Sequence, residues 1–484
     1  MKNTFTPADG NGMFQFPQPP ALDYGLNPSL IKKMYRFWLK SLIKETDNPK
    51  IIPANGHDIC NYVARYGLAN YQIQAILTLD GNIDPERMKK AVRLSFDAEP
   101  VLGCKFIESD PPYWRRRDNI DELPFFTFEE TDNMEDAILQ FLKSPFDMDE
   151  DAMVKVRLIR SGPSDALCLK INHACADGTG AKDYLMLLAD IYSRLCKDSN
   201  YVPPVHKRTH RDQNKLFEGL GIKNPELLPA APNNFPPMWN FPWKKGRRKK
   251  PGFVVCRLPY GQVEKLSEYA KSRGATINDL VLTAYYRALF KLSKPLYFVP
   301  MEIPVTVDLR RYLPEHKAEA IRNLSGGIEP RLARMPKENF DRTLSRVTAV
   351  MNRLKNNNPG LPNAIAAERV ERMSYIKFRD YIKSSLRTSN LASLLSFMPN
   401  LVFSPGLSNL GLLSKSLIKF GDITAVDAYI LPPAVRDPGL LLIACTYNGI
   451  LSLTTTYYES TVKRRNIEIL LNKIKDELIR GCNN

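Results

Sequence analysis

Histidine is scarce in this chain, with five in 484 residues, and no two of its eight cysteines form a Cys-x-x-Cys pair. That spacing gives no support to a zinc ribbon or a dithiol redox site, so we expect no metal site. Several cysteines lie inside apolar runs, as reduced core thiols do, which predicts a cytoplasmic protein. The cysteines stand at positions 60, 104, 168, 175, 196, 256, 445 and 482.

Long apolar runs are also missing, which argues against a membrane-spanning helix and against a secretory signal in residues 1–18. Residues 1–27 are rich in Pro, Gly, Asn and Gln and predict a flexible tail. Residues 30–44 place apolar side chains, among them Trp38, on one helical face and basic side chains mostly on another. We expect this helix either to pack on the body of the protein or to make peripheral contact with an anionic membrane.

Basic residues outnumber acidic ones, with 68 Lys and Arg against 52 Asp and Glu and a net charge of +16. This charge suits an anionic partner: a nucleotide-bearing cofactor, an acidic carrier protein, a membrane surface or nucleic acid. The length of the chain favours two domains of similar size. Residues 206–252 are rich in proline, contain a basic run at 244–250 and predict a linker between domains at 28–205 and 253–484.

The elements predicted on the two sides of this linker partly repeat. Before it, apolar patterns predict strands at 71–79, 99–106, 154–158 and 166–171, and helices that begin near residues 85 and 179. After it, they predict strands at 253–258, 296–307, 423–430, 440–447 and 451–458, and helices at 280–292 and 467–479. We therefore predict an α/β fold (α+β, with mixed sheets) in two halves with a cleft between them.

The strand predicted at 166–171 runs into Asn172-His173-Ala174-Cys175-Ala176-Asp177-Gly178, after which a helix is expected. A histidine at such a junction can direct its ring into a cleft while the backbone is anchored on both sides. Its usual pKa near 6.5 lets it accept and return a proton at neutral pH. The alternative is a buried structural histidine followed by an Asp-Gly turn.

This stretch resembles the His-His-x-x-x-Asp-Gly motif of the chloramphenicol acetyltransferase-like superfamily. The superfamily includes condensation domains of peptide synthetases, alcohol acetyltransferases and polyketide-associated acyltransferases. Further segments resemble the family's in the same order: 79–84 with 99–102, Gly-Ala-Thr-Ile-Asn-Asp at 274–279, Pro-Val-Thr-Val-Asp-Leu-Arg at 304–310 and Ser-Asn-Leu-Gly at 408–411. The resemblance implies two acyltransferase subdomains that form a pseudo-dimer around a central cleft or tunnel.

The resemblance also implies an activity for the motif. His173 would be the general base on a hydroxyl or amine that attacks the thioester carbonyl of an acyl-CoA or an acylated carrier protein. Asp177 would pair with Arg310 behind the motif and support the loop, and Gly178 would let the chain turn. No permanently bound cofactor is implied, because the acyl donor is a co-substrate. The acceptor would be a small molecule or a lipid.

The chain departs from the family pattern at two places. Asn172 stands where the family has its first histidine, and the Asp-Phe-Gly-Trp-Gly motif of the plant branch is missing, with residues 420–422 at most a remnant. Ser408 and Asn409 could line the thioester channel, or could form a turn that only stabilises a loop. Because no adenylation or carrier segment accompanies the motif, we expect a stand-alone, monomeric enzyme.

Three other hypotheses compete with this one. Cys175 lies two residues from His173 and could be a nucleophile, although no oxyanion-hole signature accompanies it. The chain could also be a binding protein with this fold and no turnover. Nucleic-acid binding rests on net charge and on the basic run alone, and we do not expect it.

Overall fold

The computed structural model describes residues 50–205, 211–228, 238–387 and 404–482. The predicted tail at 1–27, the predicted helix at 30–44 and parts of the predicted linker at 206–252 lie outside the described residues. All eight cysteines carry free thiols. Among the helices described, none is long and apolar enough to cross a membrane.

A six-stranded mixed sheet carries most of the first half of the chain, in the order β14-β15-β2-β7-β6-β5. Its central strands pair antiparallel, and β5 pairs parallel to β6. The strands are β2 (Gln72–Leu79), β5 (Phe126–Glu130), β6 (Val154–Ser161), β7 (Ser164–Asn172), β14 (Lys419–Phe420) and β15 (Ile423–Leu431).

A second six-stranded mixed sheet carries the later half, in the order β11-β10-β13-β16-β17-β8. The tight turn between β16 and β17 lies at Asn448 and Gly449, whose positive φ angles of 47° and 73° are typical of the predicted Asn-Gly hairpin. The strands are β8 (Pro251–Arg257), β10 (Val305–Asp308), β11 (Ser325–Ile328), β13 (Pro405–Leu412), β16 (Leu440–Tyr447) and β17 (Ile450–Tyr458).

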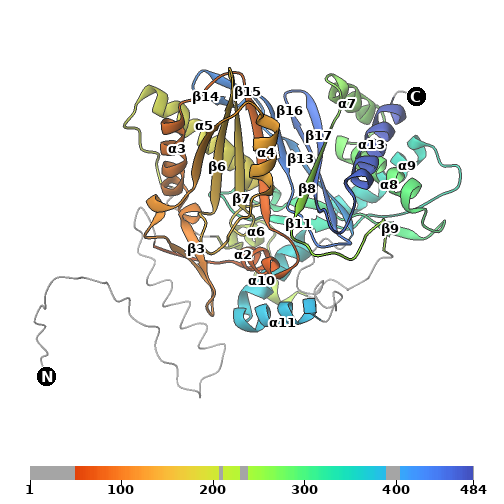
Figure 1. Ribbon diagram of the computed structural model, residues 1–484. Coiled ribbons are helices and arrows are strands. Elements are labelled where there is room, and N and C mark those ends of the chain that lie inside the picture. Colours follow the sequence, from red (N-terminus) through yellow and green to blue (C-terminus); the bar gives the residue numbers. More distant parts are fainter. Residues whose placement is uncertain (1–49, 206–210, 229–237, 388–403, 483–484) are drawn as a thin grey trace, which may run out of the picture.

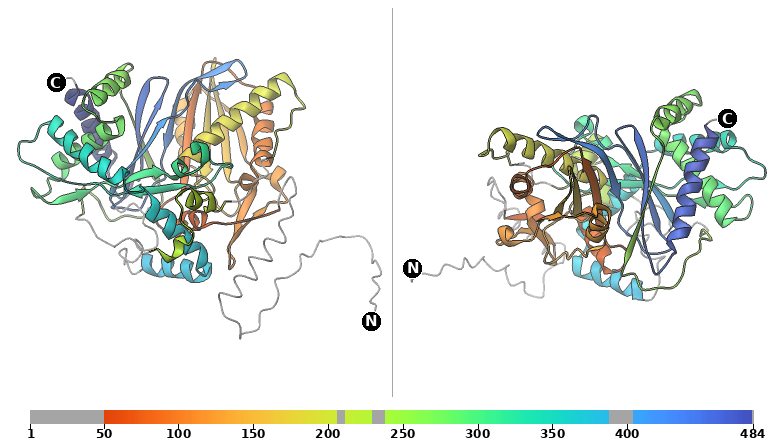
Figure 2. Two further views of the ribbon diagram at one scale, coloured as in Figure 1. Left: turned by 180° about the vertical axis from the view of Figure 1, so that it is seen from behind. Right: turned by 45° about the horizontal axis from the view of Figure 1, so that its top comes forward.

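The two sheets stand side by side, with helices on their outer flanks (Figure 1). Helices α3 (Pro85–Ala98) and α5 (Gly178–Lys197) pack on one face of the first sheet, and α4 (Met134–Lys143) packs on its other face. Helices α8 (Ile277–Ser293), α9 (Phe340–Lys355) and α13 (Arg464–Gly481) cover the second sheet. Both views in Figure 2 show the same arrangement, which confirms the predicted α/β fold with mixed sheets.

The remaining elements connect or flank these layers. Strands β1, β4 and β3 form a small sheet, and β12 with β9 forms a two-stranded ribbon. Their bounds are β1 (Ile51–Pro53), β3 (Cys104–Ile107), β4 (Tyr113–Arg116), β9 (Pro300–Glu302) and β12 (Arg331–Ala333). The other helices are α2 (Gly56–Val63), α6 (Asn214–Gly219), α7 (Gln262–Ser272), α10 (Leu361–Arg372) and α11 (Tyr375–Arg387).

Strand β15 ties the two halves together. It follows the second sheet's β13 in sequence, yet it pairs antiparallel with β2 of the first sheet, from Leu431 opposite Gln74 to Ala425 opposite Leu79. The halves are therefore interlocked by a strand exchange. The division of the chain into domains at 28–205 and 253–484 stays a proposal.

Local sequence signals account for several helix starts. Asp84 caps α3 by accepting a hydrogen bond from the Arg87 amide at 2.9 Å, and Pro85 occupies the first turn. The predicted capping box opens α8, where the Thr276 hydroxyl accepts from the Asp279 amide and the Asp279 carboxylate accepts from the Thr276 amide.

Two predicted strands are wrong in part. Residues 99–106 were expected to be one strand, but a 3₁₀ turn over Pro100–Gly103 precedes the short β3. Residues 296–307 were also expected to be one strand, with an edge or a bend at Pro304, but the chain breaks into β9 and β10, which belong to different sheets. In the second case the break lies at Pro304. Proline has no amide hydrogen to donate to a neighbouring strand, so it interrupts the pairing there.

Candidate active site

His173 lies directly after β7, where two cavities meet. The larger cavity has a volume of about 620 Å³ and the smaller one about 140 Å³. Both are lined by His173, Val305, Thr306, Ser325, Ile328, Pro433 and Leu441. The histidine ring is thus reached from two sides, between residues of both sheets. Within the described ranges, no group of three or more acidic, His or Cys side chains could hold a metal ion.

The His173 ring contacts the amide side chain of Asn323. Its Nδ1 lies 3.2 Å from the Oδ1 of Asn323, while the Asn323 Nδ2 donates a hydrogen bond to the Ala174 carbonyl at 2.8 Å. Because that second bond uses the donor end of the amide, the end that faces His173 is an acceptor. Nδ1 must therefore carry the proton in the neutral ring, which leaves the lone pair on Nε2.

The backbone and the burial of the residue complete this environment. The His173 amide donates to the Tyr71 carbonyl at 2.9 Å, and the centres of the two rings lie 5.3 Å apart. Burial lowers the pKa of His173 below its usual 6.5, although hydrogen bonds such as that to Asn323 oppose the shift. The imidazole is therefore neutral at pH 7, as a general base requires.

We expect Asn323 to control both the tautomer and the pKa of His173. In Asn323→Ala the acceptor for Nδ1–H is lost, so the pKa of His173 falls and kcat drops about three- to tenfold, as for one hydrogen bond. In Asn323→Asp the carboxylate stabilises the imidazolium, so the pKa rises. Nitrogen-15 NMR of the labelled imidazole measures tautomer and pKa without turnover. Equal pKa values in the two variants would contradict this role.

Asp177 and Arg310 form the buried ion pair that the resemblance implied. The Nη1 and Nη2 atoms of Arg310 lie 2.9 and 3.1 Å from the Asp177 carboxylate oxygens, and both side chains are almost wholly buried. The same carboxylate accepts from the amides of Gly180 at 2.8 Å and Leu324 at 2.7 Å. Burial opposes its ionisation, but the charge of Arg310 and these hydrogen bonds lower the pKa of Asp177 below 3.8. Asp177 also caps α5.

Gly178 is the first residue of α5, and its lack of a side chain has a different reason from the one expected. No positive φ requires glycine here; instead, a Cβ would come within 2.7 Å of the Leu410 side chain of β13. The residue therefore allows the start of α5 to approach the second sheet closely. A substitution would require the Leu410 side chain to shift.

A second buried ion pair holds the same loop and was missed by the sequence analysis. Arg211 forms two hydrogen bonds of 2.7 Å to Asp58, and its Nη2 donates to the Cys175 carbonyl at 2.8 Å. The sequence Asn55-x-x-Asp58 is a capping-box signal that could have located α2. No local pattern marks Arg211, which lies in the predicted linker, or Asn323.

Cys175 and Asn172 support the loop from inside. The Cys175 thiol donates to the Asn172 carbonyl at 3.0 Å, and burial raises its pKa to about 12, so it stays protonated at neutral pH. This environment argues against the alternative in which Cys175 is a nucleophile. The Asn172 side chain, which stands in place of the family's first histidine, accepts from the Ala174 amide at 2.8 Å.

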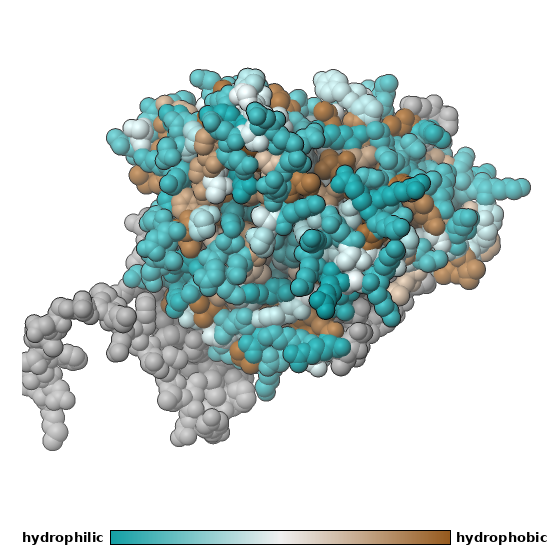
Figure 3. Space-filling model, viewed as in Figure 1, coloured by the Kyte–Doolittle hydropathy of each residue, from teal (hydrophilic) through white to brown (hydrophobic). Residues whose placement is uncertain are grey.

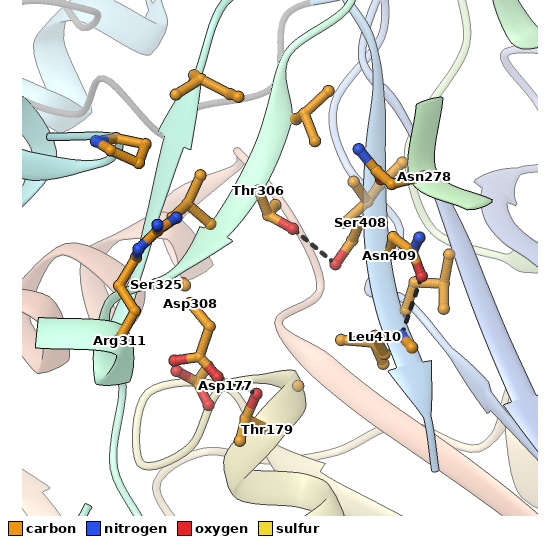
Figure 4. Close-up of a pocket in the computed structure, with 18 of the residues that line it drawn as sticks. Asp177, Thr179, Asn278, Thr306, Asp308, Arg311, Ser325, Ser408, Asn409 and Leu410 are labelled. Carbon is orange, nitrogen blue, oxygen red and sulfur yellow. Dashed lines mark hydrogen bonds between the residues drawn. The ribbon is translucent and has the colours of Figure 1, made fainter. Parts of the chain in front are cut away.

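Ser408 and Asn409 of β13 line the larger cavity, as expected for a channel wall. The hydroxyls of Ser408 and Thr306 lie 3.0 Å apart across two neighbouring strands, as Figure 4 shows. Asn409 also accepts from the Gly411 amide at 2.9 Å, so the turn expected as the alternative is present too. The Asn409 side chain therefore both stabilises this turn and lines the cavity.

Three cations surround the larger cavity. Lys182 donates to the carbonyls of Leu410 and Leu412, and Lys355 lies 3.4 Å from the Asp279 carboxylate. Arg311 stacks over the Tyr312 ring and also lines a neighbouring cavity of about 510 Å³. Asp177 and Asp308 also line this cavity, but both contact Arg310, so Lys182, Lys355 and Arg311 still favour a ligand with negative charge.

The fold and the motif's position define a class: two mixed sheets interlocked around a central cavity, with the His-x-x-x-Asp-Gly loop at the end of a central strand. Residues 67–215 match the Condensation domain family. Tyrocidine synthase 3 from Brevibacillus parabrevis is 24% identical over 232 residues, which are 46% of this chain. The chain spans only 4% of the length of that relative.

Solved structures show the same fold over most of the chain. A trichothecene 15-O-acetyltransferase from Fusarium sporotrichioides has a TM-score of 0.64 and 15% identity, covering 90% of this chain and 96% of that one. The starter condensation domain of rhizomide synthetase, solved with C8-CoA, has a TM-score of 0.59 and 13% identity, covering 90% and 95%. The predicted resemblance to the chloramphenicol acetyltransferase-like and condensation-domain superfamily is confirmed: the chain has its pseudo-dimeric fold.

Proposed function

We propose that the chain transfers an acyl group from a thioester, either acyl-CoA or an acylated carrier protein, to a hydroxyl or amine acceptor. The observation that carries this proposal is the place of His173. Its neutral ring, with the Nε2 lone pair available, lies where two cavities meet, so a donor and an acceptor could reach it from different sides. Such a site suits a proton transfer between two substrates.

The chemistry follows from these positions. Nε2 of His173 takes the proton from the acceptor as its oxygen or nitrogen attacks the thioester carbonyl carbon. The carbonyl oxygen becomes an oxyanion, for which the Ser408 hydroxyl is a candidate donor in the larger cavity, because it accepts from the Thr306 hydroxyl and keeps its own proton free. When the tetrahedral intermediate collapses, the C–S bond breaks and the imidazolium returns its proton to the leaving thiolate. No covalent enzyme intermediate is needed.

The donor is assigned to the larger cavity because of its charge. CoA and the phosphopantetheine arm of a carrier protein both bear phosphates, and Lys182, Lys355 and Arg311 lie around this cavity. The structure of the rhizomide synthetase domain with C8-CoA is an example of a relative in fold that binds an acyl-CoA. The acceptor is then assigned to the smaller cavity, whose wall includes Leu68, Ala69, Ala366, Ala367 and Val435.

Thiol release tests this function directly. The protein is incubated with acyl-CoAs of different chain lengths and with candidate alcohols, amines and lipids, and free thiol and acylated product are measured together. We expect thiol release that depends on the acceptor and matches product formation. Ligand binding without any release would instead support the alternative of a binding protein with this fold.

Arg311→Ala is expected to raise KM for an acyl-CoA about tenfold, because it removes a charge-assisted contact to phosphate. The same variant should leave KM unchanged for an acyl N-acetylcysteamine thioester, which has the reacting group but no phosphate. Steady-state kinetics with both donors measures the difference. An equal rise in KM for both donors would contradict the proposal that the phosphates bind in this cavity.

A further inference from the structure

The loop over residues 294–299, between α8 and β9, exposes three consecutive large apolar side chains. Leu296 is 78% exposed, Tyr297 44% and Phe298 66%. Lys294 and Phe298 have positive φ angles of 45° and 64°, a conformation that bulky residues rarely adopt. Figure 1 places β9, where this loop ends, at the outer edge of the molecule.

Contacts with Arg334, the residue directly after β12, hold this loop in place. The Arg334 guanidinium lies over the Tyr297 ring, 4.4 Å from its centre, and donates to the Pro295 carbonyl at 3.3 Å. In return the Phe298 amide donates to the Arg334 carbonyl at 3.1 Å. The loop is held by its backbone and by Tyr297, so Leu296 and Phe298 project outward from an ordered base.

The surroundings of the loop are cationic. Residues 291–300 and 331–337 contain no Asp or Glu, and their basic residues are Lys291, Lys294, Arg331, Arg334 and Lys337. Lys291 pairs with Glu477, and Arg331 pairs with Glu302. Among the described residues, Lys294, Arg334 and Lys337 have no carboxylate partner. An apolar tip is thus followed or preceded in sequence by three positive charges that pair with no carboxylate of the described residues.

We propose that this loop docks the protein on an anionic membrane, with Leu296 and Phe298 inserted among the acyl chains. Lys294, Arg334 and Lys337 would lie at the level of the negative headgroups, and Tyr297 would occupy the interface, where amphipathic rings are favoured. A projecting apolar tip enters a soft surface without a complementary pocket. The face seen in Figure 3 is mostly hydrophilic, with apolar residues in small groups.

Docking at this loop would bring the smaller cavity close to the membrane. The β9–β12 ribbon leads from Arg334 back to Glu329, which lines that cavity together with Ile328. Five residues of extended chain span about 17 Å. On the proposed function this places part of the wall of the acceptor cavity within about that length of chain from the loop. The membrane contact itself does not depend on that function.

Co-sedimentation of the full chain with vesicles tests the proposal. We expect stronger binding to phosphatidylcholine vesicles that contain phosphatidylserine than to pure phosphatidylcholine. The Leu296→Ser/Phe298→Ser variant should bind at least about tenfold more weakly, because two large side chains are no longer buried. Lys294→Gln/Lys337→Gln should lose about fivefold per cation, and only with the anionic vesicles.

A matched control separates the loop from other exposed apolar residues. Val202→Ser/Tyr260→Ser replaces side chains that are 70% and 78% exposed elsewhere, and it should bind as the parent does. All variants change exposed residues, so we expect their thermal unfolding midpoints to equal that of the parent. Measuring these midpoints verifies that each variant is folded. The proposal is overturned if the parent shows no vesicle binding, or if the Leu296→Ser/Phe298→Ser variant binds like the parent. The latter result would place membrane contact in another segment, such as residues 30–44.

Discussion

Replacing His173 by alanine is expected to lower kcat for acyl transfer about 10²- to 10⁴-fold, the usual contribution of a positioned general base. The ring lies at the junction of the two cavities, and its Nε2 has a free lone pair because Nδ1 carries the proton. Removing the ring removes the proton acceptor while both cavities remain. KM for the thioester should therefore change little, and thiol release under saturating donor measures the loss.

The pH dependence of the parent enzyme follows from the same environment. Burial lowers the pKa of His173 below 6.5, and only the neutral ring accepts a proton. Activity should therefore be constant near pH 7 and fall on the acid side, with an apparent pKa below 6.5. His316→Ala is a matched control that should leave this pH profile unchanged. His316 is exposed, its Nδ1 lies 2.9 Å from the Arg311 carbonyl oxygen, and it lines neither cavity. Undiminished activity of His173→Ala would rule out the proposed mechanism.

Asp177→Ala is expected to destabilise the fold by about 3–5 kcal/mol, because it leaves the Arg310 charge buried without a partner. The loss includes the hydrogen bonds that the carboxylate accepts from the amides of Gly180 and Leu324. Asp177→Asn keeps an oxygen for these amides and should be less destabilised. Urea unfolding, followed by circular dichroism, measures the changes in midpoint.

A double variant separates the ion pair from the other roles of Asp177. Replacing Arg310 by methionine in the Asp177→Asn background removes both charges, so it should recover part of the stability lost in either single variant. Because the pKa of Asp177 in the folded protein lies below 3.8, the stability due to the pair is complete above about pH 4. It is lost as the pH falls through the folded value. An Asp177→Ala variant as stable as the parent would contradict a structural role for the pair.

Local patterns predicted much of the fold. The apolar spacing located the central strands, the Asn-Gly pair located the β16–β17 turn, and the Thr276–Asp279 capping box located α8. Each of these signals acts between residues close in sequence. The prediction of a single strand over 296–307 was wrong for the same reason, since periodicity alone does not show that β9 and β10 pair with different partners.

The resemblance of the motif also allowed one long-range contact to be predicted. Asp177 and Arg310 are 133 positions apart and form the expected ion pair. It could be foreseen because both residues lie in segments that resemble those of a known family. Asn323 and the Asp58–Arg211 pair had no such marker, although they hold the ring and the loop from the opposite side.

The sequence by itself therefore determined which elements form and which loop carries the histidine of the motif, because strand and helix signals and the motif are local. Only the tertiary structure decided the electronic state of His173. The amide of Asn323, 150 positions away, orients the ring, and burial between the two sheets lowers its pKa. Both effects depend on groups that meet only after the sheets interlock through β15 and β2, so no spacing along the chain could reveal them.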